Sequence, residues 1–164
     1  MIGELAEAEH FLSEYVHGFM FHDIEAAIQG KANFLAALGL MEYTEILGGL
    51  ITGKLKDRHQ AKANFDAFLP YLGQAYVNLD KRIGLYDRVR CGLSHEYFIK
   101  GPSTIWMTAE MPTCGILWEE PKDWIHFVVS KYFDDFKSAV KIYQGRMVYG
   151  KDQELLTSFR LART

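Results

Sequence analysis

The segment from Phe34 to Ile51, FLAALGLMEYTEILGGLI, decides how this chain folds. Its length approaches that of a membrane span, but Glu42 and Glu45 lie at its centre, where each carboxylate would cost roughly 3 kcal/mol in a bilayer. Small residues alternate with large apolar ones and would let another backbone approach closely. We therefore predict a buried helix, at the centre of a helical bundle or in a dimer interface, and no membrane contact. The small residues are Ala36, Ala37, Gly39, Gly48 and Gly49.

Helical spacing of apolar residues continues on both sides of this segment. A first helix is predicted over residues 2–28, interrupted near Gly18, and Asn33 is a candidate N-cap for the central helix. The segment from Gly53 to Gln60 is polar, which predicts a connection between two helices. Pro70 should bend or split the helix that follows, and Gly101-Pro102 should end the next one. The later helices are predicted at residues 61–79, 85–99, 130–149 and 153–163.

A different pattern occupies residues 103–129. Three short runs rich in β-branched and aromatic residues, at 104–109, 115–118 and 124–129, are separated by Met111-Pro112 and Glu120-Pro121. They predict an antiparallel hairpin or meander. The chain has 164 residues, 49% of them hydrophobic, and only 4 prolines, which suits one globular domain over residues 1–164. The predicted fold is mainly α, a bundle of four to five helices with a small β-hairpin or meander inserted near residues 103–129.

Charge and cysteine content exclude several classes of protein. A formal net charge of -3 argues against a general nucleic-acid coat, so any contact with RNA must be local. Cys91 and Cys114 lack the paired spacing of a zinc site or disulfide framework, and a cytoplasmic location is expected. The acidic start of the chain is unlike a signal or transit sequence. His10, Glu14 and His17 share a helical face, but without a fourth ligand we predict no metal and no cofactor.

The octapeptide RCGLSHEY, Arg90 to Tyr97, is the strongest candidate for chemistry. An arginine can hold a phosphate, and a histidine can take a proton from an attacking 2′-hydroxyl or return one to the leaving oxygen. Residues five apart on a straight helix differ by about 140° in direction, so Arg90 and His95 share a face only if the helix bends, which Gly92 would permit. In the alternative, Arg90 pairs with a carboxylate such as Glu42 or Asp87, and His95 caps or packs within the bundle.

Other side chains could support such a site. Arg88 is a second candidate for holding phosphate, and Lys81 and Arg82 could attract RNA locally, although basic clusters are more often solvated loops. Glu42 and Glu45 could orient Arg90 or His95, or simply form a polar stripe or half of an ion pair. Trp106 and Trp118, on opposed hairpin strands, could stack on a base, although such aromatic residues more commonly belong to the core.

The octapeptide resembles the Arg-x4-to-6-His signature of the HEPN superfamily, often written Arg-Asn-x-Leu-x-His-x-Tyr. The resemblance implies a helical homodimer that acts as a metal-independent endoribonuclease, in some cases a toxin or defence component. In that role Arg90 would stabilise the scissile phosphate, and His95 would act as acid or base. Cys91 departs from the polar residue common after the arginine in active members. A non-catalytic module that binds RNA, a nucleotide or a protein such as an antitoxin or nucleotidyltransferase is therefore the alternative, and a structural dimer without a nucleic-acid role is a third.

Overall fold

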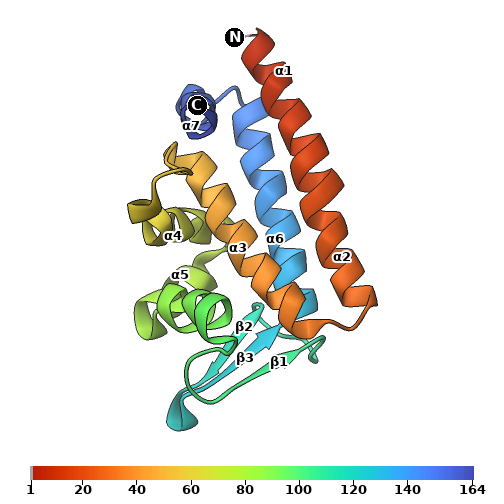
Figure 1. Ribbon diagram of the computed structural model, residues 1–164, viewed down its shortest axis with the longest axis vertical. Helices are drawn as coiled ribbons and strands as arrows, with labels where there is room; N and C mark the ends of the chain where they lie inside the picture. The colour runs from red at the N-terminus through yellow and green to blue at the C-terminus, as the bar shows by residue number, and fades with distance from the viewer. Residues whose placement is uncertain (1) are drawn as a thin grey trace.

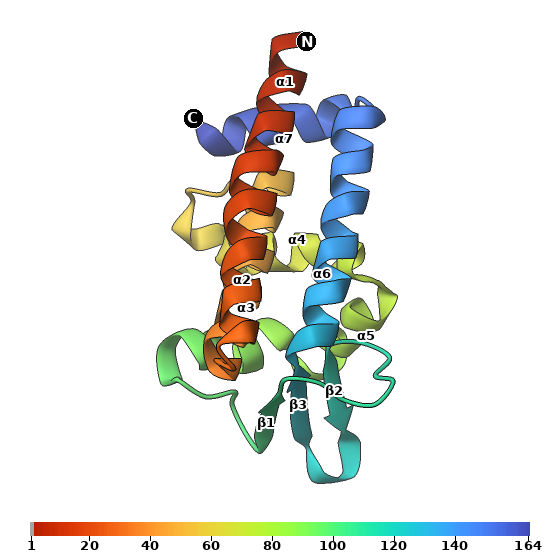
Figure 2. The same cartoon turned by 90° about the vertical axis from the view of Figure 1, so that its right-hand side faces the viewer.

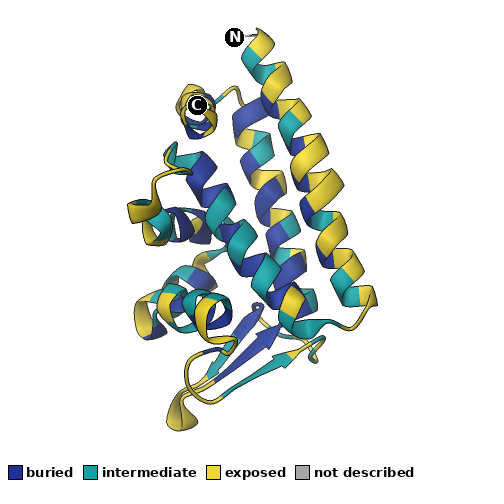
Figure 3. Ribbon diagram, viewed as in Figure 1, coloured by how far each residue is buried: buried dark blue, intermediate teal, exposed yellow. Residues whose placement is uncertain are grey.

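Long helices standing side by side form the body of the molecule, and a small sheet closes one end (Figure 1). The computed structural model describes residues 2–164. The first helix runs from α1, Ile2–Phe11, through the π-helical stretch Leu12–Phe21 into α2, His22–Gln29. It packs with α3, Asn33–Thr52, and with α6, Val129–Gln144. Buried residues face inward along α3 and α6, while much of the outer side of α1 and α2 is exposed (Figure 3).

The prediction of a buried central helix at residues 34–51 is confirmed by α3. A Cβ added at Gly48 would lie 1.6 Å from the backbone oxygen of Asn64, because α4, Ala61–Leu72, crosses α3 at that point. The small residues thus serve contact within the chain. By length and apolar composition α3 could also cross a membrane, and 50% of its most apolar window is buried inside the protein. Asn33 is not the N-cap, which is Ala32; the Asn33 amide instead donates to the Ile105 carbonyl at 3.1 Å.

The bundle has more helices than the predicted four to five. Within residues 2–164 seven α-helical segments are present, and the helix predicted over residues 61–79 is divided into two of them. Pro70 lies inside α4, and Gly73, at φ +125°, separates it from α5, Gln74–Ile83. By contrast, the interruption predicted near Gly18 is a continuous π-helical stretch with no break in the helix.

The octapeptide lies on a short helical segment made of two π-helical stretches, Tyr86–Arg90 and Gly92–Glu96. This segment ends three residues earlier than predicted, because Tyr97 adopts φ +65°, which a right-handed helix cannot contain. At the other end of the molecule, α6 continues through the π-helical stretch Gly145–Tyr149, and α7, Gln153–Arg163, follows at its predicted bounds. α7 crosses the bundle beside the chain's first helix (Figure 2).

The sheet has a topology that the sequence did not predict. Strands β1, Ser103–Trp106, β2, Ile116–Glu119, and β3, Trp124–Val128, are arranged in the order β1-β3-β2. β2 and β3 form the predicted antiparallel hairpin, with Trp118 opposite Ile125. The meander is wrong, because β1 pairs in parallel with β3, Thr104 opposite His126. The prediction assumed that consecutive strands are neighbours, whereas the long connection between β1 and β2 lets β3 lie between them.

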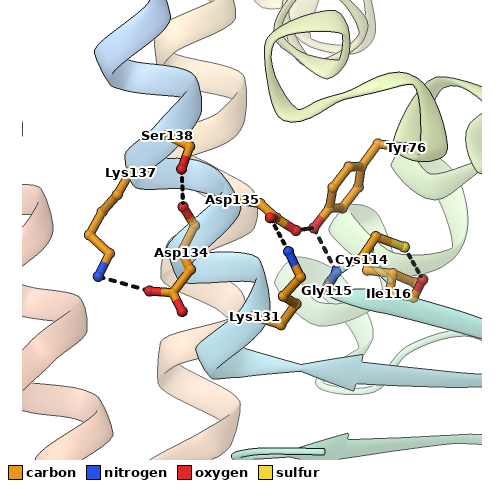
Figure 4. Close-up of polar contacts among 9 residues, drawn as sticks. All are labelled: Tyr76, Cys114, Gly115, Ile116, Lys131, Asp134, Asp135, Lys137 and Ser138. Atoms are coloured by element: carbon orange, nitrogen blue, oxygen red, sulfur yellow. Dashed lines mark hydrogen bonds and ion pairs between the residues drawn. The ribbon is translucent and has the colours of Figure 1, made fainter. Parts of the chain in front are cut away.

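A partly buried polar network ties the sheet to the bundle (Figure 4). The Tyr76 hydroxyl donates to the Asp135 carboxylate at 2.6 Å and accepts from the Gly115 N–H at 2.7 Å. Lys131, one turn before Asp135 on α6, pairs with the same carboxylate. The network therefore joins α5, α6 and the segment leading into β2 through a single side-chain hydroxyl.

Candidate functional site

Arg90 of the octapeptide lies between two carboxylates of α3. Its Nη2 is 2.8 Å from Glu42 Oε2, and its Nε is 2.7 Å from Glu45 Oε2, an ion pair that lacks hydrogen-bond geometry. Ser94, one turn further along the segment, donates its hydroxyl to the other oxygen of Glu42. The Arg90 side chain is only 12% exposed. The alternative in which Arg90 pairs with Glu42 is therefore confirmed, and both glutamates are its ion-pair partners.

The charges around Arg90 do not favour a phosphate. One guanidinium faces two carboxylates, so the cluster carries no excess positive charge even when one of them is protonated. Burial raises the pKa of Glu45, and the Glu42 charge adds to this, while Arg90 opposes it. Burial, followed by the Glu45 charge, also raises the pKa of Tyr86, whose ring lies 5.7 Å from the guanidinium carbon, to about 12. Only Nη1 of Arg90 has no protein partner within residues 2–164.

The other predicted arginines are occupied as well. Arg88 donates to both carboxylate oxygens of Asp123, at 2.8 and 3.1 Å, and to the Lys100 carbonyl. Arg82 pairs with Glu120 at 2.8 Å and lies over the Trp118 ring. Both arginines therefore hold the turn between β2 and β3. Of the predicted substrate-binding residues, only Lys81 has no ion-pair partner in the part of the chain that the structure describes.

His95 is exposed and has no hydrogen-bond partner among residues 2–164. The alternative in which His95 packs within the bundle is therefore wrong. The structure thus brings together Arg90, Glu42 and Glu45, but it leaves His95 outside this cluster of contacts. Arg82 and Arg88 belong to a separate contact with the β-hairpin.

A pocket that the sequence analysis missed lies directly after the octapeptide. It has a volume of about 310 Å³, within the range of small-molecule sites. Tyr97 and Phe98 form one wall with Phe34, and the β1 strand forms another. The sequence signal for this pocket was the pair of consecutive aromatic residues, Tyr97 and Phe98, shortly before Gly101-Pro102. The lining residues are Asn33, Phe34, Tyr97, Phe98, Ile99, Ser103, Thr104 and Ile105.

The prediction that Trp106 and Trp118 lie on opposed strands of one hairpin is wrong. These residues lie on the two outer strands of the sheet, with β3 between them. Trp118 donates its indole N–H to Asp123 at 2.9 Å, and Trp106 stacks on His126 with 4.4 Å between ring centroids. Within residues 2–164, no group of three or more His, Cys, Asp and Glu side chains is arranged to hold a metal ion.

Comparison of the chain with models of known protein families, with curated proteins and with solved structures finds no match.

Proposed function

We propose that this chain is a HEPN-like helical module that binds a nucleotide, free or within RNA, without cleaving it. The observation that carries this proposal is the aromatic-walled pocket that begins two residues after His95. A volume of about 310 Å³ suits one nucleobase with part of its sugar, and aromatic side chains bind bases by stacking. We assign the phosphate of that nucleotide to His95, whose side chain is exposed two residues before Tyr97 in the chain.

The pairing of the arginines supports binding over catalysis. Stabilising a phosphoryl transition state requires donors and positive charge that are free to meet the developing negative charge. Glu42 and Glu45 offset the charge of Arg90, and Asp123 offsets that of Arg88. Arg90 then acts as a structural residue that fixes the octapeptide segment to α3.

The metal-independent endoribonuclease remains the second candidate, because two features favour it. His95 is exposed and unpaired, as a general acid or base must be, and the Nη1 group of Arg90 has no protein partner within residues 2–164. In a homodimer a second copy would bring another His95 to this region. The homodimer stays a prediction, although the small residues of α3 no longer argue for it, because α4 occupies Gly48.

Two assays on the purified protein separate these functions. Fluorescence anisotropy with mixed-sequence single-stranded RNA and calorimetry with nucleoside monophosphates measure binding, and gel analysis of RNA in excess EDTA measures cleavage. We expect binding with no cleavage, and the same result for His95→Ala apart from a modest loss of affinity. Cleavage that leaves a 2′,3′-cyclic phosphate and falls roughly 10²-fold in His95→Ala would establish the nuclease instead. Absence of both binding and cleavage would refute both functions.

A further inference from the structure

We propose that this module binds a single-stranded RNA segment of at least two nucleotides, with one base in the pocket after the octapeptide and the next base on the outer face of the sheet. This inference rests on the proposed function, namely that the module binds a nucleotide. It adds the class of ligand and a second stacking surface, which a free nucleotide would leave empty. The argument comes from two exposed tryptophans, the position of β1 and the charges around them.

Trp106 and Trp124 lie on one face of the sheet. Thr104 of β1 is opposite His126 of β3, and their side chains meet at 2.6 Å, so both point to the same face. Side chains alternate along a strand, so the residues two positions away, Trp106 on β1 and Trp124 on β3, point to that face as well. The other face packs into the core through fully buried residues of β3. These residues are Ile125 and Phe127. The face with the two tryptophans is therefore the outer face of the sheet.

The two tryptophans form a patch that is open to a ligand. Trp106 and Trp124 are 39% and 40% exposed, while His126, whose ring contacts both indoles, is buried. The rings of Trp106 and His126 stack with 4.4 Å between centroids and 17° between planes, and the Trp124 ring lies 5.9 Å from the imidazole. Neither of these indole N–H groups has a hydrogen-bond partner within residues 2–164, unlike that of Trp118. Exposed apolar side chains gathered in one patch mark binding surfaces, and a base would extend this stack.

The pocket supplies the other stacking surface. Phe34 and Tyr97 stack with 3.9 Å between ring centroids, and Phe98 meets Tyr97 edge-on at 5.6 Å and 90°. Tyr97 and Phe98 remain 63% and 69% exposed. The Phe98 N–H donates to the Gly92 carbonyl at 3.2 Å, which fixes this wall to the octapeptide segment. A planar base would extend the stack that Phe34 and Tyr97 begin.

β1 connects the pocket with the outer face of the sheet. Three consecutive residues of this strand, Ser103 to Ile105, line the pocket, and β1 is an edge strand in the order β1-β3-β2. The pocket therefore lies along the edge of the sheet. Thr104 belongs both to the pocket lining and to the outer face, and Trp106 follows it on that face at about 7 Å, the repeat of side chains on one side of a strand. A base in the pocket and a base on Trp106 would therefore be neighbours along one RNA strand.

The charges near these two surfaces admit a phosphate backbone. Lys31 is exposed two residues before the pocket residue Asn33 and has no ion-pair partner within residues 2–164. Each carboxylate at the turn between β2 and β3 is paired with a cation and therefore adds little repulsion. These pairs are Glu119 with Lys122, Glu120 with Arg82, and Asp123 with Arg88. The net charge of -3 requires any contact with RNA to be local, and Lys31 and the exposed His95 provide such a contact beside the pocket.

Calorimetry with UMP, diuridylate and tetrauridylate RNA tests the proposal. We expect tetrauridylate to bind at least tenfold more tightly than UMP, because a second stacked base should tighten binding by roughly tenfold. This gain exceeds what the larger number of equivalent bases in the tetranucleotide alone would give. Diuridylate should already show most of it, since two bases suffice to occupy both surfaces.

Variants assign the two bases to the two surfaces. Trp106→Leu, which keeps an apolar cover over His126 but removes the indole, should bind tetrauridylate at least fivefold more weakly and UMP as the wild type does. Trp106→Phe should restore the binding of tetrauridylate. Tyr97→Asn, which removes the ring but suits the positive φ, should weaken the binding of both ligands. Tyr149→Leu, at an exposed tyrosine on the far end of α6, is the matched control and should change neither.

The outcomes separate this inference from the function on which it rests. If UMP binds as tightly as tetrauridylate, the ligand is a free nucleotide and the second surface is wrong, while the binding module stands. If tetrauridylate binds more tightly but Trp106→Leu and Trp124→Leu both match the wild type, the second base does not lie on the sheet. Trp124→Leu takes the place of Trp106→Leu if the latter does not fold. If neither UMP nor either oligouridylate binds, the proposed function fails and takes this inference with it.

Discussion

Replacing Arg90 by Met should destabilise the fold, because it would leave Glu42 and Glu45 facing each other without a counter-ion. The Arg90 side chain is 12% exposed and that of Glu45 is 18% exposed, so water can solvate the remaining charges only in part. Removing one partner of a buried ion pair costs about 3–5 kcal/mol. Glu42 is more accessible, at 35%, which lowers the expected loss in unfolding free energy to about 2–4 kcal/mol.

Urea unfolding followed by circular dichroism measures this loss directly. For a domain of this size, each kcal/mol lowers the melting temperature by about 2–4 °C, so we expect a drop of about 4–16 °C. The triple variant Arg90→Met, Glu42→Gln, Glu45→Gln should recover most of the stability, because it removes the unpaired charges. Arg58→Met, at an exposed arginine with no ion pair in residues 2–164, is the matched control and should be neutral.

If Arg90→Met changes the unfolding free energy by less than about 0.5 kcal/mol, the scale of ordinary surface substitutions, the two ion pairs contribute nothing to the fold. Loss of RNA cleavage in that same stable variant would then assign Arg90 to catalysis.

Three further variants test other parts of the structure. The folded-state pKa of Glu45 is raised above its usual 4.5, so the folded protein binds more protons than the unfolded chain and its stability falls as pH rises through that interval. When unfolding in urea is measured at several pH values, the unfolding free energy of Glu45→Gln relative to that of the wild type should therefore rise with pH. Tyr76→Phe should lose about 1–3 kcal/mol of unfolding free energy in the same assay. Tyr143→Phe should cost nothing, because the buried Tyr143 hydroxyl has no hydrogen-bond partner among residues 2–164, and equal losses would contradict this. Gly48→Ala should lower the melting temperature strongly or prevent folding, because the added methyl group would collide with the Asn64 carbonyl. A melting temperature like that of the wild type would show that α3 and α4 can separate freely.

Local patterns in the sequence predicted the helices well and the contacts between elements poorly. The central helix followed from its apolar length, and residues 153–163 formed the predicted helix because Asp152 supplies a side-chain cap at its start. Strand pairing failed because it depends on the path of a connection, and no periodicity within β1 indicates that β3 will be its neighbour. The extra helix boundary came from Gly73, three residues after Pro70, which had been expected to bend or split the helix predicted over residues 61–79.

The site shows the same division between local and long-range information. Arg90 and Glu42 were recognised as possible partners, since a buried arginine needs a carboxylate and α3 carries two. The consecutive aromatic residues Tyr97 and Phe98 were a local signal, but they could not predict the pocket itself, because its walls come from residues 33–34, 97–99 and 103–105, which meet only once β1 is placed. Asn33 illustrates the difficulty: its sequence position suggested a helix cap, yet its amide binds a strand carbonyl 72 residues away.

The parallel pairing of β1 with β3 sets an order of events during synthesis on the ribosome. β1 forms one wall of the pocket, but β3, the strand that pairs with it, ends at Val128, more than twenty residues further along the chain. A nascent chain that has emerged only as far as the octapeptide and β1 has no strand to hold that wall in place. Ligand binding should therefore appear late in translation, after β3 has left the exit tunnel, and a chain stalled before residue 124 should carry the complete octapeptide without a working pocket.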